Sequence, residues 1–281
     1  MADASQTKET AMDEKALGDE IWYWYLTGEW RVPPPPEVLR HIKMEKTLFG
    51  WMPSDPHCIE CGVPMAGIGA NLLRWRGSTP SSFSSKICSG CERFARQHES
   101  GAEVELTMLF ADVRGSTPLA ESTPTLEFKS LIQRFYKETS HVLVHLNSMV
   151  NRLMGDQVSA LFVPRFAGKD HAKVAIQAAQ EVLRATGHGS KDGPWIPVGV
   201  GVHTGMAYVG AVGSPTGVNE IAVLGSAANL CARLSSSAAA GEILVSEDAV
   251  RSAGWAAEGT ERRELELKGV SGKVGVRVIK V

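Results

Sequence analysis

Residues 106–117 read Leu106-Thr-Met-Leu-Phe-Ala-Asp112-Val-Arg-Gly-Ser-Thr117, an apolar run that ends in a carboxylate and a Gly-Ser-Thr turn. The run predicts a buried strand, and the turn predicts the start of a helix with apolar residues along one side. A carboxylate binds a hard cation, and the N–H groups at a helix start attract an anion. The combination suits a metal-bound phosphate chain. The alternative is an aspartate that only caps the turn.

Strand and helix patterns alternate from this stretch to residue 281. Strands are predicted at 104–112, 148–154, 157–163, 197–203, 243–246, 262–267 and 273–280, with a Gly-rich hairpin over 204–224. Helices are predicted at 117–122, 125–146, 169–187 and from Ser226 onward. This order predicts an α+β fold of the ferredoxin-like type, an antiparallel sheet with helices packed on one face.

A second carboxylate, Asp156, follows Gly155 in a tight turn between two predicted strands. The first strand of a ferredoxin-like sheet is central and lies beside this hairpin, so we expect Asp112 and Asp156 at one sheet edge. Two carboxylates that close repel each other unless a cation lies between them. Such a pair with two Mg²⁺ or Mn²⁺ ions suits the in-line attack of a hydroxyl on a phosphate. A turn aspartate without a ligand is the alternative.

Asn229 and Arg233 are four residues apart in the helix predicted from Ser226, so they share one helix face. Such a pair can orient a ribose and neutralise the charge that develops on a pentavalent phosphorus. Taken alone, the two residues are better explained as an exposed polar pair.

The three motifs read, in order, Phe110-x-Asp112-Val-x-Gly115-x-Thr117, Gly155-Asp156 and Gly225-x-x-x-Asn229-x-x-x-Arg233, and one strand ends in His203-Thr204-Gly205. Together they resemble the class III nucleotidyl cyclase catalytic domain over residues 103–281. The resemblance implies cyclisation of a nucleoside triphosphate, ATP by default, to a 3′,5′-cyclic monophosphate and pyrophosphate. It also implies two Mg²⁺ or Mn²⁺ ions per active site.

Sites of this family form between two catalytic domains, so the resemblance implies a head-to-tail homodimer. One subunit would supply Asp112, the Val113 carbonyl and Asp156 to the metals, and the other would supply Asn229 and Arg233. The residues expected to bind the phosphates are Gly115, Ser116 and Thr117 at the helix start and Lys268 before the last strand.

The sequence departs from the family pattern at the two positions that read the base. Arg152 stands where adenylyl cyclases usually have Lys, and Ala222 stands where they usually have Asp or Thr. Arg donates hydrogen bonds but accepts none, so it does not select one base, and Ala222 has no acceptor. Glu220 lies two residues earlier, on the same strand face, and could replace it. A GTP or pyrimidine triphosphate cyclase and a non-catalytic nucleotide sensor therefore remain alternatives.

Four of the five cysteines form two Cys-x-x-Cys pairs, Cys58 with Cys61 and Cys88 with Cys91. Two such pairs can complete a tetrahedral site, so we expect one structural Zn²⁺ per chain. Rubredoxin-like iron and a redox-active dithiol are the alternatives. A zinc-ribbon nucleic-acid binder is a further alternative, although the basic residues between 74 and 96 are more simply explained as solvated surface.

The sequence divides into five predicted segments: a disordered tail over 1–13, an aromatic-rich helical segment over 14–54, a Cys₄ module over 55–96, a linker over 97–102 and the catalytic domain over 103–281. Four of seven tryptophans precede residue 60. They either cover a domain or dimer interface or form a slot for a regulatory ligand or protein. Pro33 to Pro36 predict a stiff spacer.

Charge and hydropathy exclude some classes of protein. The formal net charge is −2, so no overall basic field favours nucleic acid or an anionic membrane. No apolar run approaches the roughly 18 residues of a membrane helix, and the polar first ten residues do not resemble a secretory signal. We therefore expect a cytoplasmic protein with reduced thiols, no membrane partner and no nucleic-acid partner.

Overall fold

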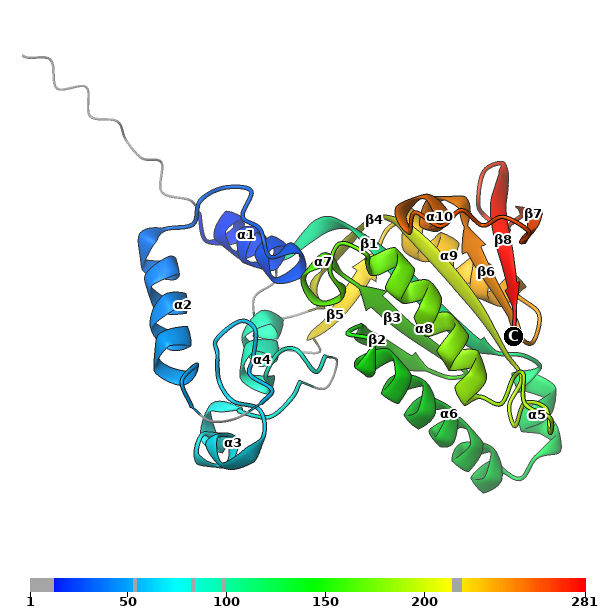
Figure 1. The fold of residues 1–281 in the computed structure, drawn as a ribbon, viewed down its shortest axis with the longest axis horizontal. Coiled ribbons are helices and arrows are strands. Elements are labelled where there is room, and N and C mark those ends of the chain that lie inside the picture. The colour runs from blue at the N-terminus through cyan, green and yellow to red at the C-terminus, as the bar shows by residue number, and fades with distance from the viewer. Residues whose placement is uncertain (1–12, 53–54, 82–83, 98–99, 214–218) are drawn as a thin grey trace, which may run out of the picture.

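The computed structural model describes residues 13–281 except 53–54, 82–83, 98–99 and 214–218 (Figure 1). The predicted tail therefore lies outside the described residues except for Asp13. The helices are α1 (Glu14–Thr27), α2 (Pro36–Phe49), α3 (Gly67–Leu72), a 3₁₀ turn (Arg74–Arg76), α4 (Ser89–Gln97), α5 (Ser116–Ser122), α6 (Thr125–His145), α7 (Pro164–Ala167), α8 (His171–Ala185), α9 (Ser226–Ser237) and α10 (Glu247–Ser252). Within this part of the chain, no helix has both the length and the apolar character needed to cross a bilayer.

One eight-stranded sheet forms the body of the fold. Its strands are β1 (Gly101–Val113), β2 (Met149–Met154), β3 (Gln157–Phe162), β4 (Val198–Gly213), β5 (Asn219–Leu224), β6 (Glu242–Ser246), β7 (Glu261–Glu266) and β8 (Lys273–Lys280). The order is β2-β3-β1-β4-β6-β8-β7, and β5 pairs with the distal half of β4. The α+β class predicted from the sequence is confirmed, and the predicted strands fall on the observed ones.

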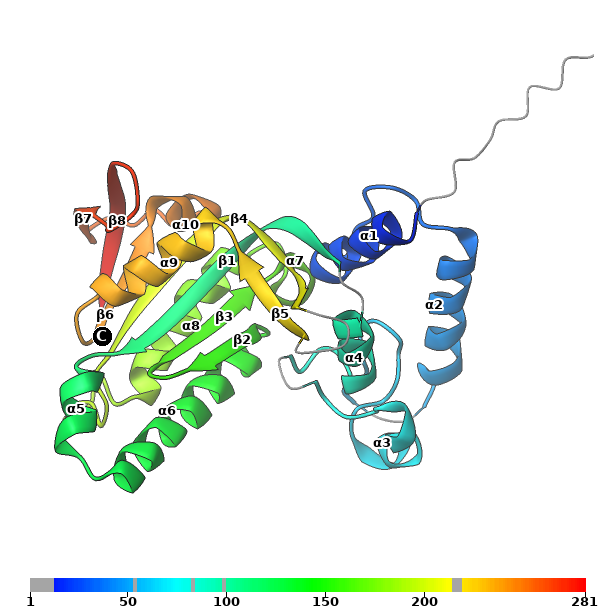
Figure 2. The same cartoon turned by 180° about the vertical axis from the view of Figure 1, so that it is seen from behind.

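Two details of the predicted sheet are wrong. Helices cover both of its faces: α6 and α8 lie on the face seen in Figure 1, and α9 lies on the face seen in Figure 2. Strand β1 is buried on both sides, with Leu109 and Ala111 in one hydrophobic cluster and Met108 and Phe110 in the other. The sheet is also mixed, because β4 and β6 are parallel. A parallel pair needs a crossover connection, and α9 lies in it.

The N-terminal region packs on the α9 face of the sheet. Trp22 and Leu26 of α1 share one hydrophobic cluster with Met108 and Phe110 of β1, and the same cluster includes apolar side chains of the Cys-rich loops. Because the cluster is shared, one continuous core holds the Cys-rich module and the sheet together. Apolar burial of this kind stabilises the folded state by roughly 25 cal/mol per Å².

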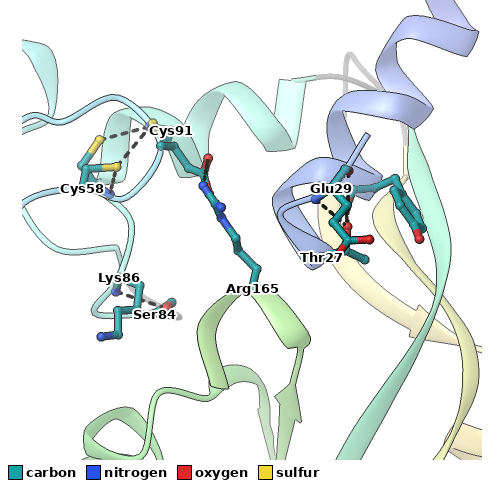
Figure 3. A network of polar contacts seen from close by, with 10 residues as sticks. Thr27, Glu29, Cys58, Ser84, Lys86, Cys91 and Arg165 are labelled. Carbon is teal, nitrogen blue, oxygen red and sulfur yellow. Dashed lines mark hydrogen bonds and ion pairs between the residues drawn. The ribbon is translucent and has the colours of Figure 1, made fainter. Parts of the chain in front are cut away.

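A buried ion pair adds a polar joint between these two parts. Arg165 of α7 extends toward the loop that carries Cys58 and the helix α4 that carries Cys91 (Figure 3). Its Nε and guanidinium NH₂ donate to Glu60 at 3.3 and 3.4 Å. The Glu60 side chain is 2% exposed. Burial raises the pKa of Glu60 to about 7, and Arg165 opposes that rise. The Arg165 guanidinium also lies 5.1 Å from the ring of Trp24 in α1, so one side chain ties α7 to both N-terminal elements.

We expect Arg165→Met to lower the free energy of unfolding by about 3 kcal/mol, because it leaves a buried carboxylate without its partner. The double variant Glu60→Gln/Arg165→Met should lose less than the sum of the two single variants, because no unpaired charge then remains. Urea unfolding of the four proteins at equal metal content measures this coupling. Strict additivity would show that the ion pair does not join the two parts.

Candidate active site

Asp112 lies near the end of the central strand. It is opposite Gln157 of β3 and Gly199 of β4, so pairing on both sides fixes its backbone. Burial raises the pKa of the Asp112 carboxyl, the nearby Arg114 guanidinium lowers it, and the negative charge of Asp156 raises it. The Asp112 carboxylate is therefore partly desolvated and within the field of a second carboxylate.

Asp156 reaches the same end of the sheet from the β2–β3 turn. Gly155 has φ +61°, a left-handed conformation that glycine adopts without strain, and this lets the chain reverse in two residues. The Val113 N–H donates to the Asp156 carbonyl at 3.0 Å, and the Ser116 hydroxyl donates to the Asp156 carboxylate. The structure thus brings Asp112, Val113 and Asp156 together at one end of the sheet, where the central strand β1 meets the β2–β3 turn.

The start of α5 lies beside this end of the sheet. Gly115 is its N-cap residue, without a side-chain capping bond, and Ser116 and Thr117 form its first turn. Thr117 is exposed, whereas Ser116 is turned toward Asp156.

The residues at this end of the sheet fit a hard divalent cation. Both acidic side chains offer oxygen ligands, which Mg²⁺ and Mn²⁺ prefer. Their mutual repulsion and partial burial favour a positive charge next to them. In this structure Arg114 supplies that charge, since its guanidinium lies 2.6 Å from Oδ1 of Asp112.

Three neighbours of the carboxylates were not singled out from the sequence. Arg114 links Asp112 to the end of α9 by donating to the Ser236 carbonyl at 2.8 Å. Gln157 Nε2 lies 3.4 Å from Asp112 Oδ2, and the Tyr136 hydroxyl donates to the Gly155 carbonyl at 2.6 Å. The position of Arg114, two residues after Asp112, was a signal available in the sequence. Tyr136 comes from α6, so only the tertiary structure places it.

Asn229 and Arg233 lie on the outer side of α9, and both are exposed. The inner side of the helix buries Cys231, whose thiol donates to the Met108 carbonyl at 3.3 Å. This close approach requires Gly201 on β4, because a Cβ there would lie 2.4 Å from the backbone of α9. Among the described contacts of this chain, neither Asn229 nor Arg233 reaches Asp112 or Asp156.

Arg152 of β2 and Glu220 of β5 meet although their strands are not neighbours in the sheet. The Arg152 guanidinium lies 2.5 Å from the Glu220 carboxylate, and both side chains are about half exposed. Ala222 lies two residues further along β5, opposite Gly210 of β4, on the same strand face as Glu220. Lys268 is exposed in the loop between β7 and β8.

The four cysteine thiols of Cys58, Cys61, Cys88 and Cys91 form a separate cluster, with all sulfur atoms within 4.8 Å of one another. The Cys58–Cys91 and Cys61–Cys88 Sγ distances are both 3.7 Å. Four ligands at 2.3 Å around a tetrahedral Zn²⁺ lie about 3.8 Å apart, whereas a disulfide needs about 2.05 Å. The Cys88 N–H also points at Cys58 Sγ at 3.3 Å, as suits a thiolate. The cluster therefore fits a tetrahedral metal ion.

Comparison with known proteins adds independent information. Residues 99–280 match the family described as the adenylate and guanylate cyclase catalytic domain. An adenylate cyclase of Anabaena cylindrica is 27% identical over 135 residues, which are 46% of this chain and 26% of that protein. The match thus spans about a quarter of the length of this curated relative.

Solved structures agree with this match. The guanylyl cyclase Cya2 is 26% identical, with a TM-score of 0.57 over 63% of this chain and 92% of that chain. The adenylyl cyclase CyaB from P. aeruginosa has the same fold, with 24% identity and a TM-score of 0.55 over 65% of this chain and 97% of that one. Because the family match covers well over half of the residues, we conclude that the chain belongs to the class III adenylate and guanylate cyclase family.

Proposed function

We propose that this protein is a nucleotidyl cyclase that converts a nucleoside triphosphate, ATP by default, to a 3′,5′-cyclic monophosphate and pyrophosphate. The observation that carries the proposal is the meeting of Asp112 and Asp156 at one end of the sheet, beside the start of α5. Two partly buried carboxylates within each other's field repel unless positive charge lies beside them, and this favours a divalent cation at this position.

In this proposal Asp112, Asp156 and the Val113 carbonyl hold two Mg²⁺ or Mn²⁺ ions per active site. When bound, the ions would lower the pKa of the ribose hydroxyl and stabilise charge on the phosphates. Arg114 competes with metal for Asp112, because its guanidinium lies 2.6 Å from that carboxylate. Gly115, Ser116 and Thr117 would bind phosphate oxygens at the helix start, and Lys268 would contact the phosphates from the loop after β7.

Asn229 would orient the ribose, and Arg233 would neutralise negative charge on the reacting phosphorus. Both are exposed on α9, and neither makes a described contact with the carboxylates of its own chain. We infer that they act on the partner's substrate, in a head-to-tail homodimer with two sites. Each site would then take its acidic half from one subunit and its Asn/Arg half from the other.

Complementation tests this arrangement directly. We expect Asp112→Ala and Arg233→Ala each to lose cyclase activity, measured with Mn²⁺ and each of the four triphosphates. Mixed in equal amounts after subunit exchange, they should recover about a quarter of the wild-type activity, because half of the dimers then carry one intact site.

A mixture of Asp112→Ala with Asp156→Ala is the matched control and should stay inactive, because both lesions fall in the same half-site. Equal recovery in both mixtures, or none in either, would contradict the shared site. Nucleotide binding without turnover in the wild-type protein would instead support a non-catalytic sensor.

The base pocket of this proposal uses the Arg152–Glu220 pair. Glu220 would accept a hydrogen bond from the exocyclic amine of adenine, in place of the missing acceptor at Ala222, while Arg152 donates to the ring. We expect Glu220→Ala to lower kcat/KM for ATP relative to GTP by about tenfold, the usual effect of losing one such bond. Glu266→Ala, an exposed change on β7, is the control. An equal effect on both triphosphates would remove Glu220 from base selection.

We also propose that Cys58, Cys61, Cys88 and Cys91 hold one structural Zn²⁺ per chain, in a module over 55–96 that is joined through residues 97–102 to the catalytic domain. Elemental analysis should find about one zinc per chain, lost in Cys58→Ser but kept in Cys231→Ala. Chelation should open the module to protease before the catalytic domain unfolds, because the metal holds its loops. Iron in the wild-type protein, or unchanged protease resistance after chelation, would refute the structural zinc.

A further inference from the structure

A cavity of about 720 Å³ lies in the N-terminal region, away from the carboxylates. It is bounded by α1, α2, α4 and the Cys-rich loops, whose arrangement is seen in Figure 1. Sites for small molecules usually measure about 300–1,000 Å³ and are mostly apolar with a few polar groups. The volume and the lining of this cavity match that description.

Five aromatic side chains line the cavity, together with aliphatic side chains and three cysteines of the Cys₄ cluster. The aromatic residues are Trp24, Tyr25, Trp30, Trp75 and Phe94. Trp24 and Trp30 are stacked, with ring centroids 5.2 Å apart and planes 10° apart. Trp75 and Phe94 are 77% and 43% exposed, so large apolar surfaces lie at the rim. Such rings bind apolar groups and also attract cations to their faces. The buried Trp24 ring already has two cation partners, since Arg165 and Lys46 lie 5.1 and 5.7 Å from it, so a ligand would use the other four rings.

The charged groups of the lining are acidic. They are Glu14, Glu37, Glu45 and Glu60, and no Lys or Arg is among the described residues that line the cavity. Glu60 is paired with Arg165 at the base, and Glu45 lies 3.7 Å from His41. Glu14 and Glu37 are exposed in the first turns of α1 and α2. The rim therefore carries negative charge beside aromatic faces, which is complementary to an organic cation.

A buried polar clamp holds the aromatic wall in place. The Glu20 carboxylate, in a largely buried side chain, accepts from the N–H groups of Arg31 and Val32 at 3.1 and 3.2 Å and from Arg31 Nε at 2.7 Å. These bonds fix the loop after α1 and so keep Trp30 stacked on Trp24. Because the wall is already ordered before a ligand binds, little conformational entropy is lost on binding.

We propose that this cavity binds a small apolar organic cation, such as a quaternary ammonium or a protonated amine with an aromatic or alkyl body. The acidic rim would attract the charge, and the aromatic rings would cover both the charged head and the apolar body. The inference does not rest on the proposed cyclase activity, since it uses only residues of the N-terminal region.

The test is a titration of the full metal-loaded chain by calorimetry. The probes are benzyltrimethylammonium, the neutral benzyl tert-butyl ether, which has the same phenyl group and a similarly branched head but no charge, and the anion phenylacetate. We expect the cation to bind once per chain and about tenfold more tightly than the ether, the usual advantage of a cation at aromatic faces with nearby acids. Phenylacetate should not bind. Equal binding of cation and ether, or no binding of the cation at millimolar concentration, would overturn the proposal.

Variants locate the binding site. Glu14→Gln/Glu37→Gln should weaken binding of the cation about fivefold by removing two rim charges, and Trp75→Ala should weaken both the cation and the ether. Both changes are at exposed positions, so folding is preserved, and an unchanged melting temperature and metal content check this. Glu29→Gln, an exposed acid outside the lining, is the matched control. Unchanged affinity in both test variants would overturn the proposal.

Discussion

The register between β1 and β3 is the constraint on which the candidate active site depends. Asp112 lies opposite Gln157, so the turn residue Asp156 is its next neighbour across the pair, and the Val113 N–H bonds to the Asp156 carbonyl. A slip of one residue would turn every side chain of β1 to the other face and would separate the two carboxylates. Such a slip is prevented by burial, because β1 is apolar on both faces and each face has its own cluster.

The same burial explains why the N-terminal region and the catalytic fold form one structure. The α9 face of the sheet needs a cover, and α1 and the Cys-rich loops provide it together with α9. Arg165 adds a specific polar contact to this apolar packing. Its ion pair with Glu60 fixes the two parts relative to each other, because the Glu60 carboxylate is too deeply buried to be left without a partner. Arg165 follows β3 closely in the chain, and β3 begins next to Asp156. The aromatic wall, the Cys₄ cluster and the carboxylate end of the sheet are thus linked through one short segment.

The exposure of Asn229 and Arg233 on α9 is the basis for the proposed homodimer. The helix buries its Ala and Cys face against β1 and β4 and leaves Asn229 and Arg233 in solvent. An exposed Asn/Arg pair that makes none of the described contacts with the carboxylates of its own chain fits the proposal that it acts on a second subunit. In the proposed homodimer, each chain would provide one half of each of the two sites.

The sequence by itself determined the fold class, the order of the strands along the chain and the candidate residues of the motifs, because apolar periodicity and turn chemistry are local properties. The matching spacing of the two cysteine pairs likewise indicated one four-thiol cluster. The sequence did not determine that helices cover both faces, that β4 and β6 are parallel, or that Glu220 reaches Arg152. An aromatic slot was only one of two alternatives from the sequence, which contained no sign that Arg165 enters the Cys-rich module or that acidic side chains of α1 and α2 line a cavity together with the aromatic ones. Only the tertiary structure decided these features, because each joins segments whose separation along the chain carries no local signal, and packing alone brings them within contact distance.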